Sequence, residues 1–138
     1  MTDLQEYLFT YGTLRKGESN PMQDHLERNA KWIGKALFRG KLYYANGHPA
    51  AISSANENDI IVGDLFEFDK KSGLLHKLDR YEGFHPGRLD ESLYIRKKRD
   101  VILKESEEPR KAWIYIYNQP VERAKLIASG DYVQFSKR

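Results

Sequence analysis

The chain has 138 residues, of which 40% are hydrophobic and 12% aromatic, and 23 basic and 20 acidic residues give a formal net charge of +3. This length suffices for one hydrophobic core and is too short for two, so we expect a single globular domain over residues 1–138. Cysteine is absent, which excludes disulfides, thiolate nucleophiles and cysteine-ligated metals.

The sequence shows no segment typical of membrane insertion or export. No run approaches the roughly 18 consecutive apolar residues that a membrane helix needs. The acidic start, residues 1–6, has neither the basic nor the apolar region of a signal peptide. We therefore expect a cytoplasmic protein without a membrane partner.

The basic residues are scattered along the chain. The most basic stretch, Arg96–Arg99, lies in an alternating segment and is followed by Asp100 and three glutamates. A nucleic-acid protein usually has a one-sided basic surface with interleaved aromatic residues or a recognisable binding module. We expect a solvated strand face here and no nucleic-acid partner; an accessory nucleic-acid site on this stretch is a weaker alternative.

The first third of the chain predicts a strand, a helix and a second strand. Tyr7–Tyr11 is short and aromatic and is followed by a glycine, as at the end of a strand. Asn20 followed by Pro21 is typical of a helix start, which predicts a helix over Met22–Asn29. Lys31–Tyr44 is rich in β-forming residues but contains two glycines, which indicates a bulged or strongly curved strand.

The middle of the chain predicts a hairpin, another strand and a second helix. Asn46-Gly47 is the strongest two-residue hairpin signal, with Ala50–Ser54 as the returning strand. Ile60–Phe68 reads as the next strand. Ser72 is the expected N-cap of a helix over Gly73–Tyr81, whose leucines recur at helical spacing, and the glycine at 83 stops it.

The last third predicts an antiparallel pair and a short tail. Ser92–Leu103 and Lys111–Asn118 alternate in polarity on either side of a charged turn. Val121–Tyr132 is expected to hold a short helical piece that ends at Gly130. Glycines inside strands suit a tightly coiled sheet, so we expect an α+β fold: a small mixed β-barrel-like sheet with two or three short flanking helices.

The loop that follows the first strand has two possible interpretations. Gly12 and Gly17 are spaced as in a phosphate-binding loop, but Glu18 stands where the phosphate-binding lysine would be, which argues against a nucleotide site. Gly12 lets the following backbone N–H groups converge and lets a ligand approach them closely. The stretch is either a simple strand-ending turn or a ligand cradle. A functional group elsewhere in the chain is needed to choose between the two.

Glu82 is the candidate partner. It lies just beyond the second predicted helix and beside Tyr81 and Phe84. The negative end of the helix dipole and desolvation both disfavour the charged carboxylate, so we expect its pKa to rise, as suits a general acid/base near neutrality. The alternative is a solvated glutamate at a helix end.

Taken together, these motifs resemble the γ-glutamylcyclotransferase-like family, which includes the γ-glutamylamine cyclotransferases and proteins named after an avirulence-induced plant gene. The similar residues occur in family order over nearly the whole chain. They are Tyr11-Gly12-Thr13-Leu14, Leu78-Asp79-x-x-Glu82-Gly83, Tyr94-x-Arg96, Ala112-Trp113-x-Tyr115-x-Tyr117 and Ser129-Gly130-Asp131-Tyr132.

This resemblance implies a function and a set of site residues. The α-amine of a γ-glutamyl substrate would attack its own γ-carbonyl, giving 5-oxoproline and a free amine or amino acid without a metal or organic cofactor. Glu82 would be the catalytic acid/base. The substrate would be held by residues that share one pocket: Tyr11, Gly12, Thr13, Leu14 and, through its hydroxyl, Tyr117. Plain core packing is the alternative role for Tyr117.

Several questions stay open from the sequence. A non-catalytic small-molecule binding domain with the same cradle is the alternative function, and the motifs do not choose among γ-glutamyl substrates. Arg96 is expected to form a structural ion pair more readily than to bind a substrate carboxylate. The four histidines show no metal-ligand spacing, and the role of His85, so close to Glu82, is undecided. The oligomeric state is also open.

Overall fold

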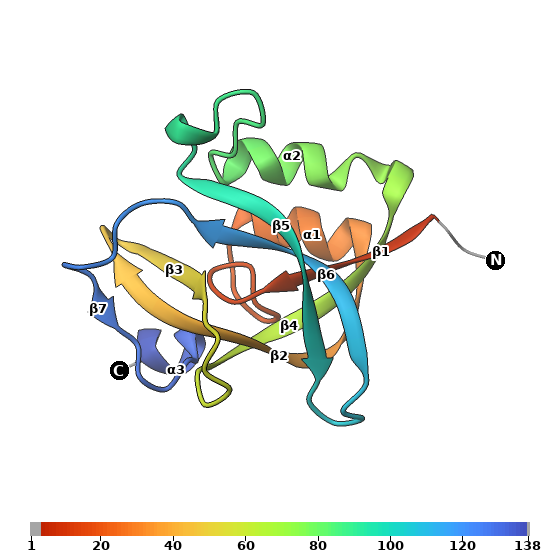
Figure 1. Cartoon of the computed structure of the whole chain (residues 1–138). Helices are drawn as coiled ribbons and strands as arrows, with labels where there is room; N and C mark the ends of the chain where they lie inside the picture. The colour runs from red at the N-terminus through yellow and green to blue at the C-terminus, as the bar shows by residue number, and fades with distance from the viewer. Residues whose placement is uncertain (1–3, 138) are drawn as a thin grey trace.

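The computed structural model describes residues 4–137, in which five strands close into a barrel (Figure 1). Around the ring these strands are β2 (Ala30–Ala45), β4 (Ile60–Asp69), β1 (Gln5–Thr10), β6 (Pro109–Tyr117) and β5 (Tyr94–Leu103), and β5 pairs with β2 to close it. Strand β1 is antiparallel to β4 and parallel to β6, so the sheet is mixed, as predicted.

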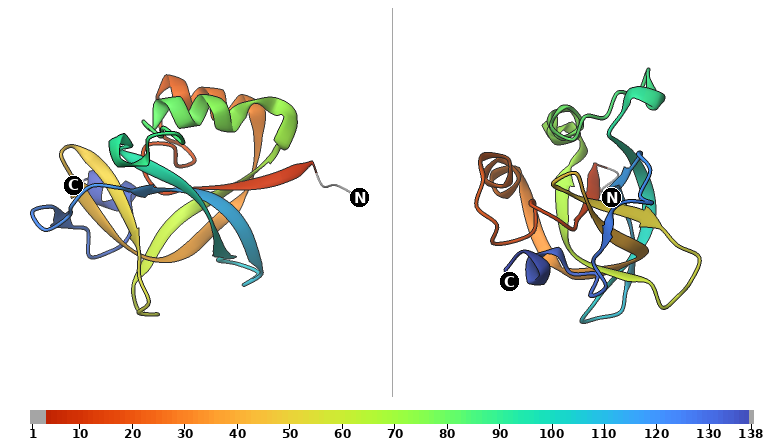
Figure 2. Two further views of the ribbon diagram at one scale, coloured as in Figure 1. Left: turned by 45° about the horizontal axis from the view of Figure 1, so that its top comes forward. Right: turned by 90° about the vertical axis from the view of Figure 1, so that its left-hand side faces the viewer.

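Two further strands and three α-helices in residues 4–137 surround the barrel. Strands β3 (His48–Ser53) and β7 (Lys125–Leu126) both pair with β2. Helices α1 (Pro21–Asn29) and α2 (Leu74–Tyr81) pack together on one side, and α3 (Tyr132–Ser136) lies on another (Figures 1 and 2). Short 3-10 turns cover Lys70–Ser72 and Leu89–Glu91. The α+β class with a barrel-like sheet is therefore confirmed.

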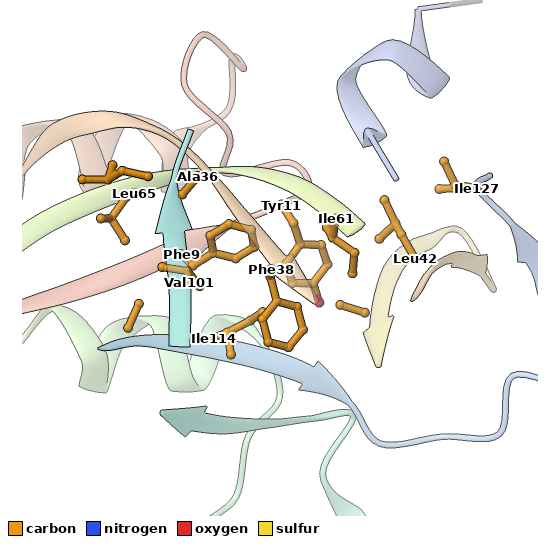
Figure 3. Packing of buried hydrophobic residues seen from close by; sticks show 13 residues of the cluster. Phe9, Tyr11, Ala36, Phe38, Leu42, Ile61, Leu65, Val101, Ile114 and Ile127 are labelled. Atoms are coloured by element: carbon orange, nitrogen blue, oxygen red, sulfur yellow. The ribbon is translucent and has the colours of Figure 1, made fainter. Parts of the chain in front are cut away.

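Alternation along the strands divides the buried side chains into two clusters. On β1, Phe9 and the following Tyr11 point into the barrel, where Phe9 packs against Phe38 with ring centroids 6.1 Å apart (Figure 3). Leu8 belongs to the second cluster, which fills the space between the barrel and helices α1 and α2. Burying one face of each helix in this way positions the C-terminal end of α2 over the end of β1.

Local signals located most of these elements correctly. Asn20 caps α1, and its side chain accepts a hydrogen bond from the Gln23 N–H at 2.8 Å. Asn46 and Gly47 form the predicted hairpin turn with φ values of 51° and 82°, the left-handed conformation that this turn requires. Strand β2 shifts register between Trp32 and residue 34, which confirms the expected bulge.

The predicted start of the second helix was wrong. Ser72 is the last residue of a 3-10 turn that Asp69 initiates by accepting a hydrogen bond from the Lys71 N–H at 2.8 Å. The N-cap of α2 is Gly73, which offers no side chain for the purpose. Ser72 still accepts a hydrogen bond from the Leu74 N–H at 3.2 Å, so it stabilises the same junction from one residue further away.

The predicted helical piece before Gly130 was also wrong. The tail instead contains strand β7, and helix α3 begins after that glycine. Asp131 is the N-cap of α3, because its carboxylate accepts a hydrogen bond from the Gln134 N–H at 3.2 Å. The glycine therefore precedes a helix rather than ending one. None of the helices in residues 4–137 has the length and apolar character that crossing a membrane requires.

Candidate functional site

A cavity of about 310 Å³ opens where β1 ends and where α2 ends. Five of the six sequence-predicted site residues line it: Tyr11, Gly12, Thr13, Leu14 and Glu82. The sixth, Tyr117, is not among the lining residues. Two segments that are about seventy positions apart in the sequence therefore face one hollow, whose size is at the lower end of the range for small-molecule sites.

The loop after β1 leaves its backbone donors unused. Its carbonyl groups are occupied: the Gly12 oxygen accepts from the Arg15 N–H at 3.1 Å, and the Thr13 oxygen accepts from the Asn20 side chain at 2.8 Å. No hydrogen bond within residues 4–137 uses the backbone N–H of residue 12, 13 or 14. Gly12 and Leu14 are buried and Thr13 is half-buried. Because buried N–H groups almost always find an acceptor, donors at these positions are suited to a ligand anion. We call residues 12–14 the cradle.

Position 12 of the cradle requires glycine because Pro49 packs directly against its backbone. A Cβ atom at this position would overlap the Cγ atom of Pro49, which belongs to β3 and also lines the cavity. The loop and β3 therefore touch where any side chain would separate them. This contact fixes both the path of the cradle and one wall of the cavity.

Glu82 lines the same cavity from a different element. It is the C-cap of α2, and its N–H donates to the Leu78 oxygen at 2.8 Å. Leu74 and Leu78 are fully buried and anchor the helix, so the position of the carboxyl group is set by the apolar face of α2. No hydrogen bond reaches this carboxyl group within residues 4–137, and burial raises its pKa to about 7.

Three tyrosines line the cavity near Glu82, and the hydroxyl group of each donates a hydrogen bond to another protein group. Tyr11 donates to the Tyr115 carbonyl oxygen at 2.6 Å, and Tyr115 donates to Asp79 at 2.7 Å. Tyr94 donates to the carbonyl oxygen of Pro49. Their oxygens can therefore only accept further hydrogen bonds. Burial and neighbouring negative charge raise the pKa of all three hydroxyls, so they stay protonated.

The lining of the cavity thus combines two kinds of polar group. The cradle contributes backbone N–H groups, which are donors. Glu82 and the tyrosine oxygens are acceptors. A ligand that carries both a carboxylate and an ammonium would find a matching partner for each.

Two sequence-predicted residues lie outside the cavity lining. Tyr117 packs edge-on against Tyr94, with ring centroids 5.4 Å apart, and its buried hydroxyl has no hydrogen-bond partner in the described residues. Arg96 forms the structural ion pair that we expected, with two hydrogen bonds to Asp79 at 2.7 and 3.1 Å. Its guanidinium also stacks on Trp113 at 4.4 Å.

Arg96 is expected to matter for stability rather than for ligand binding. Replacing Arg96 with leucine leaves the Asp79 carboxylate, which is largely buried, with only the Tyr115 hydroxyl. We expect the free energy of unfolding to fall by about 2 kcal/mol, less than for a fully buried pair, and KM to stay within about twofold. Urea denaturation and steady-state kinetics measure the two effects.

The matched control for Arg96→Leu is Lys111→Leu. Lys111 pairs with Asp100 on the surface, where both side chains are 73% exposed, so its loss should change stability by less than about 0.5 kcal/mol. A rise in KM at unchanged stability in the Arg96 variant would show instead that this residue binds substrate.

Several lining residues were not identified as site residues from the sequence. They are Leu8, Phe9, Thr10, Gly47, His48, Pro49, Tyr81, Leu93, Tyr94 and Tyr115. The hairpin signal predicted a returning strand over Ala50–Ser54, whereas β3 begins at His48, and no local pattern shows that this strand contacts the loop after β1. The exposed residue His85, which sequence proximity to Glu82 had singled out, does not line the cavity. Within residues 4–137, no group of three or more His, Asp or Glu side chains could hold a metal ion.

Comparison with known proteins points to one family. Residues 8–134 match the family model described as gamma-glutamyl cyclotransferase, AIG2-like. A Methanocaldococcus jannaschii protein, whose name assigns it provisionally to the gamma-glutamylcyclotransferases, is 35% identical over 131 residues, or 94% of this chain and 98% of that protein.

Two further similarities concern an enzyme and a solved structure. A Niallia circulans protein named gamma-L-glutamyl-butirosin B gamma-glutamyl cyclotransferase is 29% identical over 113 residues, or 81% of this chain and 67% of that protein. The crystal structure of a mouse AIG2-like protein superposes with a TM-score of 0.73 at 22% identity, covering 93% of this chain and 88% of that one. The latter similarity concerns the fold.

Proposed function

Because this chain belongs to the AIG2-like gamma-glutamyl cyclotransferase family, we propose that it cyclises the glutamyl group of a small γ-glutamyl substrate. The products are 5-oxoproline and a free amine or amino acid. The observation that carries this proposal is the shared cavity, whose lining includes both a carboxyl group with a pKa of about 7 and a loop with backbone donors that have no partner in the described residues.

The polarity of the cavity suggests how the glutamyl group lies in it. The substrate α-carboxylate accepts hydrogen bonds from the N–H groups of the cradle, Gly12, Thr13 and Leu14. The α-ammonium lies toward Glu82 and the oxygens of Tyr11 and Tyr94, which can accept its protons. Nucleophile and electrophile then belong to one folded molecule, so the enzyme mainly has to orient the ring closure and move protons.

The reaction needs one acid/base group. Ionised Glu82 removes a proton from the α-ammonium, and the freed amine nitrogen forms a bond to the γ-carbonyl carbon. The carbonyl electrons move onto oxygen, and they return as the bond from carbon to the leaving nitrogen breaks. Glu82 gives its proton to that nitrogen and then takes the second proton from the attacking nitrogen, which leaves the neutral lactam of 5-oxoproline. It passes this proton to the released amine, which departs as an ammonium, and the carboxylate is restored. A carboxyl pKa of about 7 suits these transfers at neutral pH.

A substrate panel tests the proposal. Purified protein is incubated with γ-glutamyl amines, γ-glutamyl amino acids, γ-glutamyl-ε-lysine and glutathione, and released 5-oxoproline is quantified by mass spectrometry. Turnover that is lost in Glu82→Gln supports the enzyme. Binding without turnover in the unmutated protein would overturn it in favour of a non-catalytic binding domain with the same cavity.

The pH dependence of kcat/KM should report the Glu82 ionisation. Since the reactive pair is an ionised Glu82 and a protonated substrate amine, kcat/KM should rise about tenfold per pH unit below about pH 7 and then level off. It should fall again when the substrate ammonium loses its proton. Initial rates measured from about pH 5 to about pH 9 give this profile. An ascending limb near the ordinary glutamate value of 4.5 would contradict the assignment.

A further inference from the structure

Arg15 is a buried cation immediately beyond the cradle. Only 5% of the residue is exposed, and its guanidinium lies between two carboxylates from distant parts of the chain. Its Nε atom donates to Asp64 Oδ2 at 2.7 Å, and its Nη1 atom donates to Asp131 Oδ1 at 3.0 Å. Arg15 is not a lining residue of the cavity, so these contacts act behind the site.

Asp64 fastens the end of the cradle loop to the barrel. It lies on β4, is 2% exposed and accepts three hydrogen bonds. Besides Arg15 these come from the backbone N–H of Lys16 at 2.8 Å and from Trp32 Nε1 at 3.0 Å. Asp64 thus holds the loop through the backbone of Lys16 and through the side chain of Arg15.

Asp131 connects the same arginine to the end of the chain. It is the N-cap of α3, and one oxygen, Oδ1, accepts from both Arg15 and the Gln134 N–H. The neighbouring Gly130 carbonyl accepts from the Val62 N–H at 2.8 Å, which fixes this segment against β4. The C-terminal segment therefore has its own attachment to the barrel and a separate contact with the loop.

We infer that Arg15 is a positioning residue through which the C-terminal segment holds the cradle in its binding geometry. Within residues 4–137 the N–H groups of residues 12–14 have no hydrogen-bonded partner, so the order of these donors depends on the carbonyl contacts already described and on what fixes the loop at either end. At one end Gly12 is held against Pro49, and at the other the Arg15 guanidinium joins Asp64 to Asp131. Loosening the second attachment should weaken binding of an anion without altering proton transfer by Glu82.

Asp131→Ser separates this role from helix capping. Serine is a good N-cap, so the start of α3 is preserved, but its short side chain does not reach Arg15. Asp131→Asn keeps an oxygen in place for both donors and serves as the conservative variant. Asp100→Ser is the control, because it breaks an exposed ion pair with Lys111 on a different part of the barrel.

Two measurements report whether the cradle stays ordered: steady-state kinetics and amide hydrogen exchange. The kinetic measurement rests on the proposed function. Asp131→Ser is expected to raise KM about tenfold, to change kcat less than about twofold and to leave the ascending pH limb near 7. Partial unfolding would instead lower kcat and leave KM unchanged. The second measurement is hydrogen exchange of the Lys16 amide, which donates to Asp64 and should exchange several times faster in Asp131→Ser.

The outcomes distinguish the inference from the proposed function. A raised KM and faster Lys16 exchange in Asp131→Ser, with Asp131→Asn and Asp100→Ser close to the unmutated protein, support it. Unchanged KM and unchanged exchange overturn it even if the protein is an active cyclotransferase. If the unmutated protein turns over no γ-glutamyl compound, the proposed function fails, and the Lys16 exchange rate still decides whether Asp131 orders the loop.

Discussion

Glu82→Gln is expected to lower kcat for 5-oxoproline release by about 10²- to 10⁴-fold, the range for loss of a general acid/base. Glutamine has nearly the same shape, so the substrate still fits and KM should change little. No other carboxylate lines the cavity in the described residues to replace it. Steady-state kinetics on the best substrate of the panel measure the effect, with Glu122→Gln, an exposed glutamate outside the cavity, as the control.

The same variant should be more stable than the unmutated protein above pH 7. A carboxyl group whose pKa is higher in the folded state binds more protons when folded, so stability falls as pH rises from about 4.5 to about 7. Glutamine removes this penalty, which amounts to about 3 kcal/mol at most. The stability difference should therefore shrink as pH is lowered toward 4.5.

Chemical denaturation of both proteins at about pH 5 and about pH 8 tests this linkage. Lower activity accompanied by higher stability at the upper pH is what a desolvated catalytic carboxylate predicts. A variant that is inactive and also less stable at both pH values would indicate a structural role for Glu82. A fully active variant would rule out acid/base catalysis by this residue.

Gly12→Ala is expected to reduce kcat/KM by about 10²-fold, because a misplacement of about 1 Å in a positioning group has effects of this size. The added methyl group would overlap Pro49 Cγ and lie 3.1 Å from its Cβ atom. The proline ring is rigid, so either the cradle or β3 has to move, and both line the cavity. The cradle donors would then be displaced from the substrate carboxylate that we propose they bind.

Gly87→Ala is the matched control for this prediction. A Cβ atom at residue 87 meets nothing within 4 Å, so activity and stability should stay close to those of the unmutated protein. Overpacking at Gly12 should also lower stability by about 1 to 3 kcal/mol. Kinetics at a temperature where the variant is fully folded separate the two effects. A Gly12→Ala variant with unchanged kinetics would show that the loop is not part of the binding site.

The sequence predicted those features that depend on neighbouring residues. Asn20 before Pro21 and Asn46 before Gly47 determine local backbone geometry, and the structure confirms the helix and the hairpin that they predict. Ser72 failed as a cap signal because Asp69 initiates a short turn that includes it. Near the end of the chain, a glycine was interpreted as a stop although Asp131 directly after it starts a helix.

The cavity lining was predictable only where a short segment contains both the residues that set its backbone conformation and the groups that could contact a ligand. The residues of the cradle and Glu82 each carry a local signal, and the structure brings them to one cavity. The remaining walls come from contacts between strands, such as Pro49 against Gly12, which no short-range pattern reveals. The same applies to Arg15, whose two carboxylate partners are 49 and 116 residues away.

The hydrogen bond from Tyr11 to the Tyr115 carbonyl joins residues 104 positions apart, and it has a consequence for how the protein reaches its working form. Since β1 must lie beside β6, about a hundred residues further along the chain, the cavity walls cannot meet until residue 115 has been synthesised. Contacts of such long range slow the search for the native state. In refolding experiments, catalytic competence should therefore return with the slowest major phase rather than with early helix formation.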